Sequence, residues 1–408
     1  MTEKNAKPQL RFAGFDDTWE QRKVGELLIE RNEQAPMNEE YPLMAFIANE
    51  GVAPKGERYD RSSLVTDTEN KLYKRTEFGD FIYSSNNLET GSIGLNKYGK
   101  ACISPVYSIF HPTGIADSNF LGRRLVRKDF INSMVKWRQG VIYGQWRIHE
   151  SDFLKIEISV PSVKEQRQIG TFLDYLDNLI TLHQRKYDKL TNVKKSMLEK
   201  MFPKNGPNVP EIRFKGFSDA WEQRKLSEIT DKVTEKNAGL QYVETFTNSA
   251  EFGIISQRDF FDHDIAKLGS LDGYYIVKNE DFVYNPRIST SAPVGPINRN
   301  KLGRTGVMSP LYTVFRPHDI DTTYLEYFFK CGYWHSFMNF NGDSGARSDR
   351  FSIRDNVFFQ MPIPIPDIDE QRKIGELLTC LDNLITLHQR ELEKLKNLKK
   401  ACLEKMFV

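Results

Sequence analysis

EQRKIGELLTCLDNLITLHQRELEKLKNLKKACLEKMF, at Glu370–Phe407, is the second copy of a segment that already stands at Glu165–Phe202 as EQRQIGTFLDYLDNLITLHQRKYDKLTNVKKSMLEKMF. The two copies are identical at 26 of 38 positions and lie 205 residues apart. In both, apolar residues recur at alternating steps of three and four, the spacing of a helix that buries one face against another helix. The sequence therefore predicts two long, similar helices.

Each predicted helix would be about 57 Å long, too long to bury its apolar face on one small domain. We expect the two to form an antiparallel coiled coil related by a pseudo-twofold axis. His183 and His388 lie at the two midpoints, so they either meet near the axis and set the register or remain half-exposed beside water. The residues expected at the helix or partner interface are Leu173, Leu176, Ile180, His183, Leu190, Leu378, Leu381, Ile385, His388 and Leu395. Further leucines at Leu179, Leu182, Leu384 and Leu387 widen the apolar face, which indicates an additional partner helix.

Both helices follow a proline-containing segment with the spacing of a capping box. Ser162 precedes Glu165 by three residues, and Asp367 precedes Glu370 by three residues. In such a box the first side chain accepts an N–H bond from the helix, and the glutamate returns to the cap. The sequence predicts that the helices begin there.

A second repeated segment lies upstream of each interior. Leu10–Leu27 (LRFAGFDDTWEQRKVGEL) returns as Ile212–Ile229 (IRFKGFSDAWEQRKLSEI). The chain is therefore two halves, each with a leader, an interior and a long helix. We predict an α+β fold with four parts: a mixed α/β recognition domain at 1–161, a helix at 162–204, a second recognition domain at 205–366 and a helix at 367–408.

Composition limits the classes of protein that fit. The 408 residues carry a net charge of only +2, so nucleic-acid binding would need local basic patches or contacts supplied by a partner. No run of eighteen apolar residues predicts a membrane span, and the N-terminus lacks the apolar core of a signal peptide. The four cysteines have neither CxxC spacing nor histidine partners, so we expect reduced thiols, no metal site and a cytoplasmic location.

The two interiors share predicted strands but differ in their loops. Phe81–Tyr83 matches Phe282–Tyr284, and Ser104–Phe110 matches Ser309–Phe315 as the pattern SPxYxxF. Helices are predicted at Phe130–Arg138 and at Thr323–Asn339. Common strands with unlike polar loops are what two modules reading different short targets would require.

The polar loops supply the candidate DNA contacts. Arg, Asn, Gln, Ser and Thr read base edges, while Lys holds phosphates, although polar loops are more often only solvated. The candidates in the first half are Asn86, Asn87, Thr90, Lys97, Lys100, Tyr143, Gln145 and Arg147. Those in the second half are Arg287, Ser289, Thr290, Arg304, Ser344, Arg347 and Arg350.

Motifs for catalysis are incomplete. Gly94–Ala101 nearly spells a phosphate-binding loop, but alanine stands where magnesium needs a hydroxyl. Asn285–Arg287 resembles the start of an adenine-methyltransferase motif without its second proline and aromatic residue. No Ser/His/Asp or Cys/His arrangement stands out, so no catalytic residue is predicted.

The chain resembles the specificity subunits of type I restriction–modification systems. The resemblance rests on the duplicated leaders, the GDFIY/EDFVY strands, the SPxYxxF segments and the two EQRxIGxxLxxLDNLITLHQR helices. The resemblance covers the whole chain. It implies a non-catalytic DNA-binding subunit in which two target-recognition domains each read one half of a split target. The paired helices would set the gap and dock the other subunits.

The resemblance also implies the partners. These are double-stranded DNA, two modification subunits that use S-adenosylmethionine to methylate adenine, and restriction subunits that use ATP and magnesium. No cofactor is expected on this chain. An independent DNA-binding regulator is the rival hypothesis, and it would bind its site tightly without a methylase partner. A pure scaffold would leave the unlike interiors unexplained.

Overall fold

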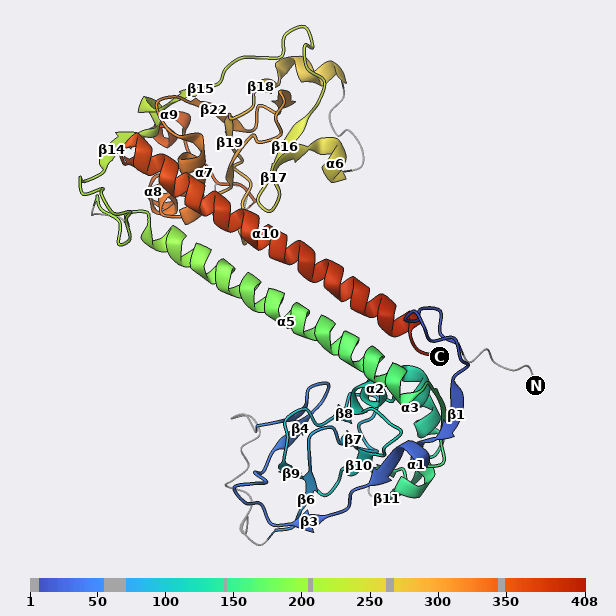
Figure 1. Ribbon diagram of the computed structural model, residues 1–408. Coiled ribbons are helices and arrows are strands. Elements are labelled where there is room, and N and C mark those ends of the chain that lie inside the picture. The colour runs from blue at the N-terminus through green and yellow to red at the C-terminus, as the bar shows by residue number, and fades with distance from the viewer. Residues whose placement is uncertain (1–6, 55–70, 143–144, 205–207, 262–267, 344–348) are drawn as a thin grey trace. The chain divides into compact units, whose positions relative to one another are not determined.

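The computed structural model describes residues 7–54, 71–142, 145–204, 208–261, 268–343 and 349–408 (Figure 1). The chain forms two compact units: the first comprises residues 1–184 and 390–408, and the second comprises residues 185–389. The boundary between the units falls within each long helix. The sequence instead predicted four parts, in which each long helix was a separate part. Each unit is described below by itself.

The two predicted long helices are confirmed. They are α5, Val163–Lys200, and α10, Ile368–Lys405, each of 38 residues. No helix in the described ranges is long and apolar enough to cross a membrane. The first half of α5 and the last part of α10 belong to the first unit, and the remaining parts belong to the second.

Within the first unit the two helix segments pack against each other and against the core. Leu173 and Leu176 of α5 are buried in the same apolar cluster as Cys402 of α10 and Met406, which follows it. Asp177 and Lys399 form an ion pair at 2.5 Å beside this cluster. The predicted interface residue Leu395 is partly buried against it.

The second unit repeats this arrangement with the opposite helix ends. Leu378 and Leu381 of α10 are buried in its core, with Leu190 of α5 partly buried against them. Lys194 and Asp382 form the equivalent ion pair at 2.5 Å. Among the other predicted interface residues, those that are half-buried are Ile180, His183, Ile385 and His388. The meeting of the two histidines joins different units and stays a prediction.

A two-stranded ribbon closes each interior. In the first unit β1 (Glu20–Lys23) pairs antiparallel with β13 (Glu157–Val160), and in the second β14 (Glu222–Lys225) pairs with β23 (Pro362–Ile365). The registers are equivalent, since Lys23 faces Glu157 and Lys225 faces Pro362. The polypeptide therefore enters and leaves each interior side by side.

A four-stranded antiparallel sheet lies within each interior, with the same strand order in both. The strands of the first are, in order, β2 (Leu28–Glu30), β10 (Ser108–Pro112), β7 (Phe81–Tyr83) and β8 (Ile93–Leu95). Those of the second are β15 (Thr230–Lys232), β22 (Thr313–Pro317), β19 (Phe282–Tyr284) and β20 (Ile297–Arg299). The strands predicted at Phe81–Tyr83 and Phe282–Tyr284 are confirmed.

The predicted second strand begins later than expected in both halves. Ser104–Tyr107 and Ser309–Tyr312 form turns, and the strands start at Ser108 and Thr313. A proline lacks the N–H that a strand donates, so it favours the turn. The two middle residues of each turn, Pro105–Val106 and Pro310–Leu311, are exposed.

Smaller sheets extend the interiors. In the first unit these are β3 (Gln34–Ala35), β6 (Tyr73–Thr76) and β9 (Ala101–Ile103), the hairpin of β4 (Ala45–Ile47) and β5 (Gly51–Ala53), and the hairpin of β11 (Gln139–Ile142) and β12 (Gln145–Arg147). In the second they are β16 (Phe246–Ser249) with β17 (Gly253–Ser256), and β18 (Tyr275–Val277) with β21 (Gly306–Met308).

Short helices connect the strands of each interior. In the first unit they are α1 (Val24–Leu27), α2 (Ser118–Arg124), α3 (Lys128–Val135) and α4 (Glu150–Phe153). In the second they are α6 (Gln257–Phe261), α7 (Thr322–Cys331), α8 (Trp334–Asn341), α9 (Asp355–Phe358) and the 3-10 turns η3 (Leu226–Glu228) and η4 (Leu268–Gly273). The single helix predicted at Thr323–Asn339 is wrong, because Gly332 ends α7 with a left-handed φ of 77°.

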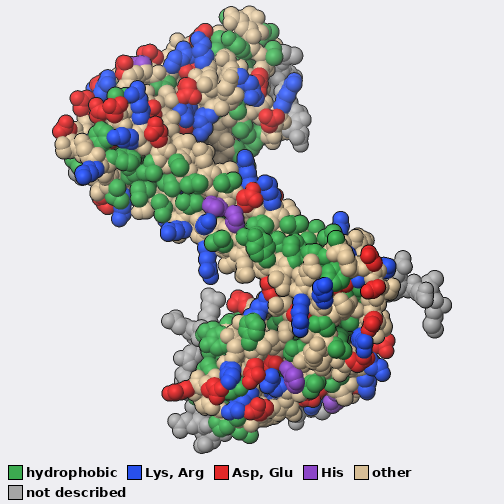
Figure 2. Space-filling view, viewed as in Figure 1, with side chains coloured by type: hydrophobic (Ala, Val, Ile, Leu, Met, Phe, Trp, Pro, Cys, Tyr) green, Lys and Arg blue, Asp and Glu red, His purple; other side chains and the backbone are tan. Residues whose placement is uncertain are grey.

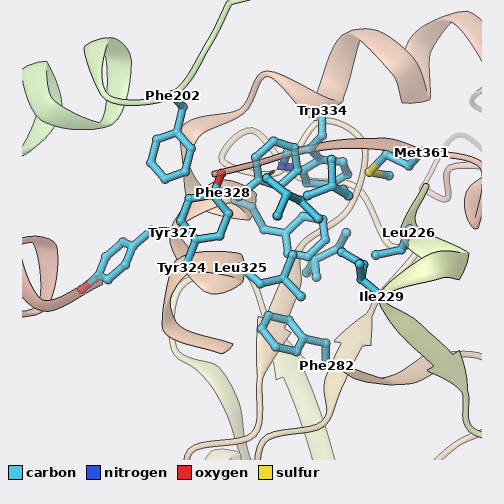
Figure 3. Close-up of a cluster of buried hydrophobic side chains, with 14 of the residues drawn as sticks. Phe202, Leu226, Ile229, Phe282, Tyr324, Leu325, Tyr327, Phe328, Trp334 and Met361 are labelled. Atoms are coloured by element: carbon cyan, nitrogen blue, oxygen red, sulfur yellow. Dashed lines mark hydrogen bonds between the residues drawn. The ribbon is translucent and has the colours of Figure 1, made fainter. Parts of the chain in front are cut away.

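Aromatic side chains form the centre of each core. In the first unit Phe153 of α4 contacts Phe81, Tyr83 and Phe110, with ring centroids 6.0, 5.0 and 4.7 Å away. In the second unit Phe202, which follows α5, points at Tyr324 and Phe328 of α7 (Figure 3). Phe407, the second residue after α10, likewise stacks on Phe120, so the second residue after each long helix is buried in an interior.

A buried ion pair joins each leader to the start of a long helix. Arg11 binds Glu165 through two N–H bonds of 2.7 and 2.8 Å, and Arg213 binds Glu370 through two bonds of 2.8 Å. The glutamate side chains are only 1% and 0% exposed. In the second unit the indole N–H of Trp221 also donates to Glu370, at 3.1 Å.

The predicted capping boxes are corrected by these pairs. The N–H of Glu165 does donate to the Ser162 hydroxyl at 3.4 Å, but the glutamate carboxylate binds Arg11. In the second unit Asp367 accepts from the N–H of Asp369, at 2.8 Å, while Glu370 binds Arg213. The glutamates that the spacing predicted as caps instead bind arginines of the leaders, which lie far away in the sequence.

The glutamine that follows each glutamate ties the helix to the interior. Gln166 accepts the N–H of Asp117, just before α2, at 2.9 Å and donates to the Pro161 carbonyl at 2.9 Å. Gln371 makes the same two bonds, with Asp321 and Pro366, at 2.9 Å each. Glutamate and glutamine together fix each interior on its helix.

Glu370→Gln should destabilise the second unit by about 3–5 kcal/mol, because it leaves the Arg213 charge buried without its counter-charge. Urea unfolding followed by tryptophan fluorescence measures the change. Asp369→Asn is the control, since the Asp369–Arg372 pair is exposed and should shift stability by about 0.5 kcal/mol or less. Equal midpoints for the two variants would show that the buried pair does not stabilise the fold.

Acid should weaken the second unit through Glu326 of α7. Burial alone would raise the pKa of Glu326, but Lys330, Arg299 and Lys301 lower that pKa to about 2. The charged carboxylate therefore stabilises the fold above its ordinary pKa, and this contribution is lost as the pH falls from about 4.5 to about 2.

Glu326→Gln should cost about 3 kcal/mol near neutral pH, and the difference from the unchanged chain should shrink as the solution is acidified over that range. The free energy of unfolding measured against pH gives the result, with the exposed Glu376→Gln as control. A difference that does not depend on pH would contradict this assignment.

Candidate nucleic-acid interface

Charge alone does not mark a binding face. In each unit, lysine and arginine side chains on the face drawn in Figure 2 are interspersed with aspartate and glutamate. The same mixture underlies the small net charge of +2. A ligand would therefore be recognised in local hollows where particular side chains converge.

Each unit contains a groove at the same place in its fold. The first groove has a volume of about 830 Å³, and the second about 460 Å³. Both lie between the turn before the long central strand and the segment before a short helix, α4 or α9. The positions that line both are Lys74 and Tyr275, Pro105–Ser108 and Pro310–Thr313, and Trp146–Ile148 and Phe351–Ile353.

The pairing of strands shows that these positions are equivalent. Lys74 pairs with Ile103 in the first unit, and Tyr275 pairs with Met308 in the second. Met308 lies 205 residues after Ile103, the same offset that relates the two long helices. The first groove thus carries a cation where the second carries a phenol. The frame of the groove is repeated, whereas its chemistry is not.

A carboxylate stands at the same corner of both grooves. Glu150 begins α4 and accepts the Ser108 hydroxyl at 2.7 Å, and Asp355 begins α9 and accepts the Thr313 hydroxyl at 3.5 Å. Burial alone would raise the pKa of Glu150, but the Ser108 bond and the charges of Lys74 and Arg147 lower it below its ordinary range. Glu150 is therefore ionised at neutral pH and acts only as an acceptor.

A second hollow of about 350 Å³ adjoins the groove in the second unit, and both are lined by Pro286, Leu311, Tyr312 and Arg350. Asn248 lies in its wall with its side-chain amide already donating to the Val283 carbonyl at 2.7 Å. The exposed rings of Phe260 and Phe261 also line it. The groove of the second unit thus continues into an adjoining hollow.

Several predicted DNA contacts fall in these hollows. Asn86 and Arg147 line the first groove, and the Arg147 side chain is 68% exposed and 4.0 Å from Glu150. Arg350 lines both hollows of the second unit, and Arg287 and Ser289 line the adjoining one. Arg287 and Arg350 face each other in a backbone bridge. Within each unit, residues that lie far apart in the sequence, such as Asn86 and Arg147 or Arg287 and Arg350, thus line the same hollow.

Other predicted contacts lie elsewhere. Asn87 and Thr90 are exposed, and the Thr90 hydroxyl donates to the Asn87 carbonyl at 3.1 Å within their own turn. Thr290 is exposed in the turn that Ser289 closes with Ala292. Tyr143, Ser344 and Arg347 lie outside the described residues, as does the side chain of Gln145. Their role as DNA contacts stays a prediction.

Three predicted cations already have carboxylate partners in their own unit. Lys97 pairs with Asp174 of α5 at 3.1 Å, and Lys100 pairs with Glu40 beside the Tyr41 ring. Arg304 makes two bonds to Glu244, at 2.7 and 2.8 Å. A phosphate bound at any of these three side chains would have to displace its carboxylate partner.

Sequence reasoning missed the residues that form the walls of the grooves. Lys74 and Trp146 line the first groove, and Lys232 lines the second, where it pairs with Asp355. Val106 and Leu311 occupy the variable position of SPxYxxF, a pattern interpreted only as a strand. The repetition of this pattern in unlike interiors was the available signal. No group of three or more His, Cys, Asp or Glu residues that could hold a metal ion occurs among the described residues.

Comparison with known proteins identifies both halves with one family. Residues 16–192 and 218–397 match Methylase_S, described as "Type I restriction modification DNA specificity domain". The chain is 24% identical over 407 residues to the type I restriction enzyme MjaVIII specificity subunit of Methanocaldococcus jannaschii, with 94% of this chain and 91% of that protein covered. The putative MjaX specificity subunit of the same organism is 24% identical over 278 residues, or 63% and 60% of the two chains.

A solved structure shows the same fold. The crystal structure of the type I restriction–modification system S subunit from M. genitalium aligns over 98% of this chain and 99% of that chain, with a TM-score of 0.51 and 13% identity. The family match covers both leaders' ribbons, both grooves and most of both long helices. The chain therefore belongs to the type I restriction–modification DNA specificity family.

Proposed function

We propose that each unit reads one half of a two-part DNA target through its groove. The family gives the chain its role in DNA sequence specificity. The observation that carries the finer assignment is the pair of equivalent grooves with different linings. Equivalent grooves fit the same element of a duplex, and different linings select different bases.

The chemistry of each groove suits base edges. The first groove offers the donors of Arg147 and Lys74, the amides of Asn86 and Gln139, and the Glu150 carboxylate. Arginine bonds best to guanine, amides bond to adenine, and a carboxylate accepts from the cytosine amino group. The second groove offers Arg350 and Asp355 with three tyrosines, so it would read a different set of edges.

The long helices would set the gap between the half-sites. A helix of 38 residues spans about 57 Å, more than one DNA turn of about 34 Å. One ion pair between α5 and α10 in each unit, Asp177–Lys399 in the first and Lys194–Asp382 in the second, supports the antiparallel coiled coil. A rigid rod of this kind holds two readers apart and leaves the bases between them unread.

The same helices would dock the other subunits. Apolar side chains remain exposed on them at Leu182, Leu384, Leu387 and Leu398. We propose that two modification subunits, which carry S-adenosylmethionine, cover this apolar face and that restriction subunits using ATP and magnesium join them. The chain would itself be non-catalytic, hold no cofactor and act in the cytoplasm. Phosphate contacts shared with the partners would account for its small net charge.

Arg147→Ala and Arg350→Ala should each weaken recognition of one half-site only. The target is first found by mapping methylated adenines in cells with and without the chain. Binding of the assembled methylase to duplexes that vary one half-site at a time then measures the effect. A base contact should cost about 1–3 kcal/mol and relax one position, whereas a phosphate contact should weaken all sequences alike.

Arg22→Ala and Arg224→Ala are the matched controls, since these arginines occupy equivalent places in the two leader ribbons, away from the grooves. They should leave both half-site preferences unchanged. If Arg147→Ala and Arg350→Ala also leave both preferences unchanged, or if each alters both half-sites, the groove assignment fails.

A further inference from the structure

An exposed apolar side chain stands at the tip of the turn beside each groove. Val106 is 66% exposed and Leu311 is 60% exposed, and both line their grooves. Each follows the proline of a Ser-Pro-x-Tyr turn. Turn positions are usually filled by Gly, Asn, Asp or Ser, so an aliphatic residue there gains neither turn geometry nor burial. Both halves nevertheless place one at this point.

The turns that present these side chains are held firmly. The Tyr107 N–H donates to the Ser104 carbonyl at 3.3 Å, and the Tyr312 N–H donates to the Ser309 carbonyl at 3.0 Å. The proline at the second position restricts the backbone further. The tip therefore needs little ordering when it meets a ligand.

The tyrosine that ends each turn anchors it to a neighbouring hairpin. The Tyr107 ring lies 5.3 Å from the ring of Phe46 in β4. The Tyr312 hydroxyl lies 3.3 Å from that of Thr247 in β16, the equivalent strand. The tyrosine thus holds the turn against the hairpin, while the aliphatic residue before it stays exposed to solvent.

The surroundings of the tips are cationic and polar. Lys74 and Arg147 line the groove beside Val106, and Lys232 and Arg350 line the groove beside Leu311. An apolar tip flanked by lysine and arginine matches the chemistry of a duplex, in which stacked apolar base faces lie between phosphates. It is a poor match for an apolar protein groove, which would bury these cations and the neighbouring carboxylates Glu150 and Asp355 away from water.

We propose that Val106 and Leu311 are wedges that insert between neighbouring base pairs, one in each half-site. This proposal rests on the proposed function, in which the two grooves bind DNA. Insertion would unstack one base step and kink the duplex, while the flanking cations hold the adjacent phosphates. Because pyrimidine–purine steps unstack most easily, each wedge would favour such a step without touching a base edge.

The test uses the whole chain assembled with its modification subunits, on duplexes with 2-aminopurine in one half-site at a time. The fluorescence of 2-aminopurine rises when the base is unstacked. Val106→Ser should abolish the rise in one half-site and Leu311→Ser in the other, each with a loss of affinity of about ten-fold. Phe78→Ser is the control, because Phe78 is 70% exposed in a turn of the first unit and lines no groove described above.

Several results would overturn the wedge. One is a fluorescence rise that persists in both variants, and another is the lack of any rise with the unchanged chain. A loss of assembly with the modification subunits, without a change in unstacking, would show that the turns contact protein. In each of these cases half-site effects of Arg147→Ala and Arg350→Ala would still support DNA reading by the grooves, so the two proposals fail separately.

Discussion

A glutamate without access to water, at the start of each long helix, is the constraint on which the rest of the structure depends. A buried carboxylate is stable only with a counter-charge and full hydrogen bonding, and Arg11 and Arg213 supply both from the leaders. The neighbouring glutamine then holds the start of α2 or α7. These bonds fix the direction in which each interior sits on its helix. A groove can read DNA at a set distance only if that direction does not vary.

Between the repeated parts, the interiors are free to differ. Each is inserted at a two-stranded ribbon of the same register, so its two ends meet at one place. Sheet order is retained, and so is the corner where a hydroxyl meets a carboxylate. The groove linings differ most plainly where Lys74 is replaced by Tyr275. Such an arrangement lets the groove linings change while the long helices stay the same.

The parts that could be predicted from the sequence are those governed by local periodicity. The long helices and the strands at Phe81–Tyr83 and Phe282–Tyr284 follow from apolar spacing alone. The single helix expected at Thr323–Asn339 failed because the left-handed backbone at Gly332 outweighed the apolar pattern. The extent of the SPxYxxF strand failed because proline turns the chain before the pairing begins.

The site was less predictable because it is assembled from distant segments. Glu165 suggested a cap, and only the fold shows that its partner is Arg11, 154 residues away. Lys74, Val106 and Trp146 share a groove, yet no spacing in the sequence connects them. In the same way, the sequence does not show that Arg304, predicted as a DNA contact, binds Glu244. Loop composition found part of the lining, and only the fold could locate the groove.

The most direct test of the central claim, that each interior reads its own half-site, is to give the chain two copies of one interior. Residues 226–361 would be replaced by residues 24–156, since the Val24–Ile156 and Leu226–Met361 backbone bonds, at 2.8 and 2.9 Å, mark equivalent junctions. Methylated adenines would then be mapped in cells that carry the modification subunits. The expected target contains the half-site of the first interior twice. Retention of the original target, with its two different halves, would contradict it.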